Sequence, residues 1–271
     1  MMHRPSLALR VAVLCYVGAL VALPLGFVFQ QALSHGLSAF VTALSNAEMD
    51  SALWLTVRVA VVAVPLNVIF GLGVSLWILR RPSRVSRVFD TLIDLPLAVS
   101  PIIVGLSLEL AYAQNGWLGR PLAAWGLHVM FTYWAIVVAS VFVSLPLVSR
   151  QVIPLLRSVG THQEQTAQTL GAGPVRIFLT VTLRSITWAA AYGVTLTIAR
   201  IIGEYGAVLI VSGNIGLRTE TLTLNISNNF GNFTPYQGFV GVSLLSLVSI
   251  LVLLVLGLAR HRERLRHGYR P

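Results

Sequence analysis

The sequence has no lysine, a single cysteine and few charged residues of any kind. All 19 basic residues are arginine, and charged residues make up 10% of the 271 positions, against about 25% in a typical soluble domain. The missing lysine excludes a standard ATP-binding P-loop, which needs a lysine to reach the nucleotide phosphates. The single Cys15 rules out an intrachain disulfide. The six histidines are scattered without metal-ligand spacing, so we expect no metal site.

Apolar residues dominate what remains, at 56% of the chain. The net charge of +10 does not predict a nucleic-acid partner, because such binding needs the charge gathered on a water-exposed face. Instead, six apolar runs approach the roughly 20 residues that cross a bilayer. We therefore predict an all-α, polytopic fold, a single transmembrane domain over 1–271 surrounded by membrane lipid. The predicted spans are 11–29, 53–79, 92–113, 131–148, 186–211 and 238–258.

The arginines predict how the six spans are oriented. Short cytoplasmic connections accumulate positive charge. With the N-terminus placed inside, 15 arginines fall on the inner side, whereas Arg120 and Arg218 alone fall outside. We therefore expect both termini to be cytoplasmic. The inner arginines are Arg4, Arg10, Arg80, Arg81, Arg84, Arg87, Arg150, Arg157, Arg176, Arg184, Arg260, Arg262, Arg264, Arg266 and Arg270.

The long inner connection, 149–185, carries signals for a short helix. Thr161 and Glu164 have the spacing of a capping box, in which the two side chains satisfy free amides at a helix start. The helix would continue to Leu170 and end at Gly171 in a left-handed conformation. This spacing leaves two interpretations open: a docking element for a cytoplasmic partner, or a surface helix that only shields loop backbone.

The same connection resembles the "EAA" loop of ABC-importer permeases. The spacing is kept, but Gln165 stands where the family has glutamate, with Glu164 one position earlier, Thr166 replaces an alanine and Arg184 replaces a proline. The resemblance implies docking onto a separate cytoplasmic ATPase subunit. The implied coupling residues are Glu164, Gln165, Ala167, Leu170, Gly171 and Ala172.

A wider resemblance covers about residues 45 to 225 and is to the CysW-type sulfate/thiosulfate permeases of bacterial ABC importers. The segments that carry it are Leu53-Trp54-Leu55-Thr56-Val57, Val64-Pro65-Leu66-Asn67-Val68-Ile69-Phe70-Gly71, Asp94-Leu95-Pro96-Leu97-Ala98-Val99-Ser100-Pro101, and Arg200 with Gly203-Glu204-Tyr205-Gly206. The last segment is shared with molybdate permeases, so molybdate, tungstate or another oxyanion stays an alternative substrate.

The resemblance also implies an assembly. This chain would be a type I permease of the bacterial inner membrane. It would pair with a sister permease, two ATP-binding subunits and an extracytoplasmic sulfate/thiosulfate-binding protein. It would need no cofactor and hold no catalytic residue, because ATP and magnesium would bind the partner subunits.

Two charges lie inside the predicted fifth span. An ionisable group at the bilayer centre costs about 2.5–3.5 kcal/mol on insertion scales, so Arg200 and Glu204 invite a functional interpretation. Either they form an i,i+4 ion pair that only packs the bundle, or Arg200 lends positive potential to an anion pathway that Glu204 tempers. Other candidates for the pathway are Thr197, Ser100, Asn67 and Thr56.

Two other classes of protein remain open. A stand-alone anion channel or ion-coupled carrier would not need the long inner connection. An integral membrane enzyme would need a cluster of histidine, aspartate or nucleophile residues near one interface, and the sequence shows none.

Overall fold

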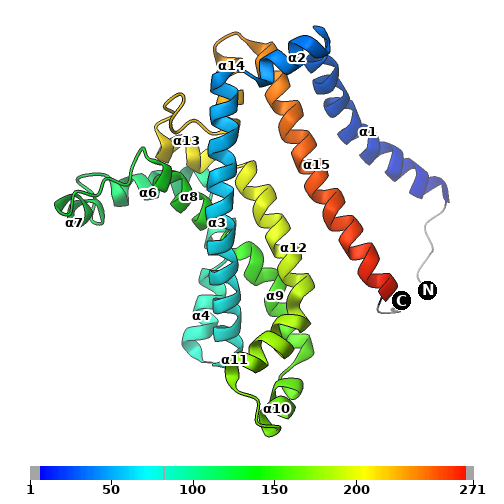
Figure 1. Ribbon diagram of the computed structural model, residues 1–271, viewed down its shortest axis with the longest axis vertical. Helices are drawn as coiled ribbons and strands as arrows, with labels where there is room; N and C mark the ends of the chain where they lie inside the picture. The colour runs from blue at the N-terminus through cyan, green and yellow to red at the C-terminus, as the bar shows by residue number, and fades with distance from the viewer. Residues whose placement is uncertain (1–6, 82, 267–271) are drawn as a thin grey trace.

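The computed structural model describes residues 7–81 and 83–266, and all regular structure in these ranges is helical (Figure 1). The elements are α1 Leu7–Ala32, α2 Gly36–Leu44, α3 Ala47–Arg80, α4 Arg84–Leu92, α5 Leu95–Ala98, α6 Pro101–Tyr112, α7 Gly119–Ala124, α8 Tyr133–Ser144, α9 Pro146–Val159, α10 His162–Thr169, α11 Pro174–Ile177, the π-helix η1 Phe178–Thr182, α12 Leu183–Ile202, α13 Gly206–Ser212, α14 Leu222–Gly231 and α15 Pro235–Arg266.

Five helical stretches among the described residues are long and apolar enough to cross a membrane. They are Val11–Ala32, Ala47–Arg80, Tyr133–Val159, Pro174–Ile202 and Pro235–Val255. A sixth arises if the bent pair Arg84–Ala98 and Pro101–Tyr112 is counted as one span. The all-helical, multi-span prediction is therefore confirmed, whereas several boundaries differ.

The predicted third span, 92–113, is not one straight helix. Its two halves meet at 108°, and α6 projects sideways from α3 together with α7 (Figure 1). Val99 and Ser100 are extended, with ψ of 140° and 136°. Proline disfavours helical geometry in the residue before it, so Pro101 forces the break at Ser100. The sequence indicated a kink here but not its size.

The inner connection and the fifth span are also shifted. Most of 149–185 is helical, because α9 continues to Val159 and the next helical stretch already begins at Pro174. That stretch ends at Ile202 rather than near 211, and a three-residue break separates it from α13. Ser149, Val152 and Ile153, at the start of the predicted connection, are buried, so this part of α9 belongs to the packed core rather than to a loop.

The core lies where α3, α8, α9, α12 and α13 meet. A Cβ added at Gly71 of α3 would lie 2.7 Å from the Val148 Cβ, and one added at Gly193 of α12 would lie 2.8 Å from the Val148 Cα. These two glycines let α9 enter between α3 and α12 at backbone contact distance. Above this point, Val59 and Ala63 of α3 pack against Ile136 of α8.

The first and last helices form a separate pair. α1 packs chiefly against α15, with an edge-to-face contact between Phe27 and Phe239 whose ring centroids are 5.9 Å apart. From the end that carries α2 and α14, both helices extend toward the half of the molecule that carries α10 (Figure 1). The start of α1 and the end of α15 therefore lie on the same side, as expected for a chain that crosses the membrane an even number of times.

Candidate functional site

The helix α10 lies at one extreme of the molecule and is open to its surroundings (Figure 1). None of its residues is buried, and Leu170 at its end is 83% exposed. Gly171 follows with φ of +80°, and the amides of Gly171 and Ala172 donate to the carbonyls of Gln168 and Ala167. This pair of bonds is the Schellman ending of a helix. The predicted left-handed stop at Gly171 is confirmed.

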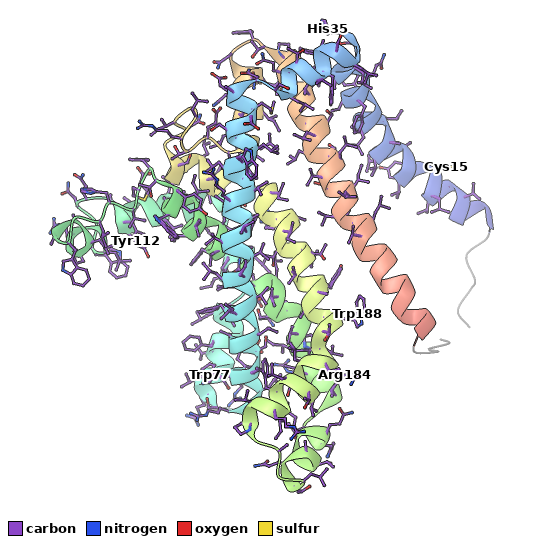
Figure 2. The ribbon with its side chains drawn as sticks, viewed as in Figure 1. Cys15, His35, Trp77, Tyr112, Arg184 and Trp188 are labelled. Carbon is purple, nitrogen blue, oxygen red and sulfur yellow. The ribbon has the colours of Figure 1, made fainter. Side chains whose placement is uncertain are left out.

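An apolar ridge continues from α10 onto the next turn. Leu170, Val175 and Leu179 are 83%, 70% and 56% exposed. Leu170 follows α10, Val175 lies in α11 and Leu179 lies in η1, and α10 and α11 lie in the same half of the molecule as the labelled Arg184 and Trp77 (Figure 1 and Figure 2). Large aliphatic side chains exposed so close together in the chain make this segment a candidate for a surface that another protein covers.

The predicted capping box does not form. Thr161 precedes α10 but makes no side-chain cap bond. The Glu164 carboxylate instead accepts a hydrogen bond from Arg80 Nη2 at 3.0 Å and another from the Thr182 hydroxyl. These donors come from the end of α3 and the end of η1. The carboxylate is drawn to a guanidinium and a hydroxyl of other helices, which bind it more strongly than a neutral amide would.

A second ionic cluster joins α4 and α5 to α9. The Arg150 guanidinium donates to both carboxylate oxygens of Asp94, and it lies 3.2 Å from Asp90 Oδ1. Arg157 donates to Asp90 Oδ2 at 2.9 Å. Sequence reasoning missed this cluster. The signal in the sequence was an aspartate at the end of one apolar run and an arginine at the end of the next. Charges in such places need partners, so the two residues could have been expected to pair.

Arg200 and Glu204 form the expected i,i+4 ion pair, with 3.3 Å between Arg200 Nη2 and Glu204 Oε2. The two side chains differ in exposure, at 42% for Arg200 and 2% for Glu204. Glu204 also accepts from the Ala207 amide at 3.0 Å, and its carbonyl accepts from the Thr223 hydroxyl. Glu204 therefore bonds to the first turn of α13 and to α14, whereas the Arg200 side chain is partly exposed.

The other predicted pathway residues divide into buried and exposed. Thr56 is buried, donates to the Ala52 carbonyl and accepts from the Leu222 amide at 2.9 Å. Thr197 is fully buried and donates to the Gly193 carbonyl. Both threonines pack helices together within this chain. Ser100, at the break before α6, is exposed and its side chain makes no cap bond.

Asn67 occupies the deepest position of the set. Its side chain is fully buried and donates from Nδ2 to the Ser144 hydroxyl at 2.7 Å. Its Oδ1 atom has no hydrogen-bond partner among the described residues. Asn67 thus ties the proline-containing helix α3 to the end of α8.

A polar layer stabilises the end of the molecule opposite α10 and was also not predicted. The Glu220 carboxylate is buried and accepts from the side-chain amides of Asn225 and Asn228. Asn228 and Asn214 exchange two further amide bonds. The segment between α13 and α15 is therefore a folded cap built around α14.

Comparisons with known proteins agree with this architecture. Residues 67–265 match the model of the family described as the binding-protein-dependent transport system inner membrane component. That match covers well over half of the chain. The chain belongs to this family of multi-pass ABC-importer permeases.

Several relatives that resemble this chain are permease proteins of sulfate transport systems. The chain is 40% identical over 227 residues to a "Sulfate transport system permease protein CysW" from Synechocystis sp., covering 83% of this chain and 82% of the relative. It is 41% identical over 220 residues to the CysW protein of Escherichia coli, covering 78% and 75%. The CysT permease of Escherichia coli is 35% identical over 216 residues, covering 79% and 77%.

A solved structure shares the fold. The chain matches a crystal structure of a bacterial ABC transporter that imports the acidic polysaccharide alginate, with a TM-score of 0.73, 15% identity and coverage of 95% and 94%. At this identity the likeness concerns the fold alone.

Proposed function

We propose that this chain is the permease subunit of an ATP-driven importer of sulfate or thiosulfate in a bacterial inner membrane. The observation that carries the proposal is the 40% identity with a CysW sulfate permease across most of both chains. The exposed helix α10 supports it, because an importer whose motor is a separate protein needs a docking surface on the permease.

The assembly we propose has five protein chains besides the anion. This permease pairs with a sister permease, and two cytoplasmic ATP-binding subunits bind α10 and its counterpart. A sulfate/thiosulfate-binding protein delivers the anion from outside. Relatedness of this one chain to both CysW and CysT proteins supports a pair of similar permeases. A neighbour of the same fold, solved with a periplasmic protein that holds alginate, supports delivery by a binding protein.

The pathway we propose passes Arg200 and Ser100. A dianion cannot enter an apolar bore without donors that replace its hydration, and those donors must not hold it too tightly. Arg200 has an exposed guanidinium face whose charge Glu204 partly offsets. Ser100 offers an exposed hydroxyl at a helix break, and this hydroxyl makes no cap bond to the start of α6. Thr197, Thr56 and Asn67 shape the pathway by fixing the helices behind these two residues.

The test is nucleotide-dependent uptake by the reconstituted complex. Proteoliposomes that hold the permease pair and the ATPase, with binding protein outside and ATP inside, should accumulate labelled sulfate. Uptake should require ATP and should not fall with excess molybdate. Loss of sulfate uptake to a molybdate excess would reassign the substrate to another oxyanion. Anion flux through the permease alone, without nucleotide, would instead favour a channel or carrier.

A further inference from the structure

Glu164 is the exception on an otherwise outward-facing helix. Its side chain is 20% exposed and lies between two other helices, whereas Gln165 beside it is exposed and bonds only locally, to the Thr161 hydroxyl at 3.3 Å. Gln165 occupies the position at which the sequence resembles the family's glutamate. The carboxylate of this chain is therefore displaced by one residue and is turned inward.

Three polar side chains meet at this point. Arg80 Nη2 lies 3.0 Å from Glu164 Oε1 and 3.5 Å from Thr182 Oγ1, and the Thr182 hydroxyl donates to the same carboxylate oxygen. Thr182 is 1% exposed, so its hydroxyl has little access to water. We call the three residues Arg80, Glu164 and Thr182 the clasp. It joins α10 to the last residue of α3 and to the last residue of η1, directly before α12.

The chain segments on both sides of α10 contain glycines and are more flexible than the clasp. Gly160 precedes the helix with φ of +67°, and Gly171 and Gly173 follow it. A Cβ added at Gly171 or Gly173 would meet nothing within 4 Å, so neither glycine is held by packing. A cavity of about 270 Å³ lies beside the clasp and separates α10 from the apolar residues Leu76 and Leu156. Polar bonds, rather than close packing, hold α10 in place.

Thr182 also ends an unusual helical turn. η1 is a five-residue π-helix that leads without interruption into α12. Single π-turns of this kind are frequent at functional sites. The clasp is thus attached directly before α12, the helix that carries Arg200 near its other end.

We propose that Glu164 is a positioning residue that transmits movement of α10 to α3 and α12 through the clasp. The inference rests on the proposed function, in which α10 binds the ATPase. When the ATPase subunits close, α10 pulls on Arg80 and Thr182 directly, and the glycine connections do not absorb the displacement. The glutamate that the sequence alone assigns to the ATPase contact serves instead inside the permease.

The first experiment measures coupling in the reconstituted complex. Glu164→Ala and Thr182→Val should keep assembly and ATP hydrolysis but lower the sulfate transported per ATP by about tenfold, the effect of losing one charge-assisted hydrogen bond. Thr180→Val is the matched control, because its exposed hydroxyl bonds only to the Arg176 carbonyl in the same turn. The control should transport normally. An unchanged ratio in both clasp variants would overturn the proposal.

A second experiment does not depend on the substrate. Spin labels at Gln168→Cys on α10 and Thr187→Cys on α12, in a variant without Cys15, report the distance between the two helices. The distance distribution should broaden in Thr182→Val and stay narrow in Thr180→Val. A distribution that stays narrow in both refutes the clasp even if the variants assemble poorly. If the wild-type complex moves no sulfate while the broadening is seen, the proposed function fails and the clasp stands.

Discussion

At the scale of single residues, Arg200 and Glu204 form one ion pair but have different roles. Glu204 is almost fully buried and bonds to the backbone of α13, whereas Arg200 is 42% exposed and has Glu204 as its charged partner among the described residues. Removing the glutamate would disturb the helix junction. Removing the arginine would take away the charge that faces outward and would also leave the buried Glu204 carboxylate without its cation.

Arg200→Gln should therefore raise the KM for sulfate by about tenfold or more, because a hydrogen bond to a charged group contributes about 1.5–3 kcal/mol. Arg200→Lys, which keeps the charge, should lose less. The melting temperature of Arg200→Lys should stay near that of the wild type, whereas that of Arg200→Gln should fall, because the buried Glu204 loses its cation. Glu204→Ala should also lower the melting temperature, because the helix junction loses the carboxylate that accepts from the Ala207 amide. An Arg200→Gln complex with unchanged KM would remove Arg200 from the anion pathway.

At the scale of helices, two glycines predict opposite outcomes for the same substitution. Gly171 has positive φ but open space around it, so leucine there costs about 1–2 kcal/mol of backbone strain and no steric clash. Gly193 has negative φ but touches the Val148 backbone, so leucine there would push α12 away from α9.

Gly171→Leu should insert and assemble as a permease pair but abolish sulfate uptake, because the side chain alters the docking surface. Gly193→Leu should lower the yield and the melting temperature of the permease itself. Size-exclusion profiles of the purified pair and ATPase pull-down separate the two effects. Normal uptake by Gly171→Leu would argue against docking at α10.

The sequence predicted most about features that depend on one stretch of chain alone. Apolar runs reveal the helices, the arginine bias predicts their orientation, and Gly171 indicates a helix end, because each of these effects is local. The sequence was least informative where two distant helices decide the outcome. Thr161 and Glu164 match the sequence pattern of a capping box, but the Glu164 carboxylate bonds to Arg80 and Thr182 of other helices instead. The partners of Asp94 and Asn67 were hidden for the same reason.

The bend before α6 shows a mixed case. Pro101 dictates that the chain leaves the helix at Ser100, and this could be read from the residue order. The angle of 108° depends on what α6 packs against. Gly105 of α6 allows that packing, since a Cβ there would lie 2.9 Å from the Ala207 carbonyl oxygen of α13. A contact between residues a hundred positions apart is not visible in a local pattern.

At the scale of the whole molecule, the single cysteine makes the orientation directly testable. With Cys15 replaced by serine, a cysteine at Leu170 should react with an impermeant maleimide only in inside-out vesicles. A cysteine at Phe233, which is 92% exposed between α14 and α15, should react only in right-side-out cells. These side chains lie at opposite ends of the molecule, so reaction of both from one side would refute the proposed placement of α10 in the cytoplasm.

The pairing of α1 with α15 has a consequence for biosynthesis. About 200 residues separate the end of α1 from the start of α15, and at about 5–20 residues per second the ribosome takes roughly 10–40 s to make them. During that interval α1 lies in lipid without the helix it packs against, and its apolar stretch is 0% buried by the rest of the chain even in the finished fold. Its retention in the bilayer during that interval must come from its own side chains, and it can pack onto α15 only after the last helix has been made.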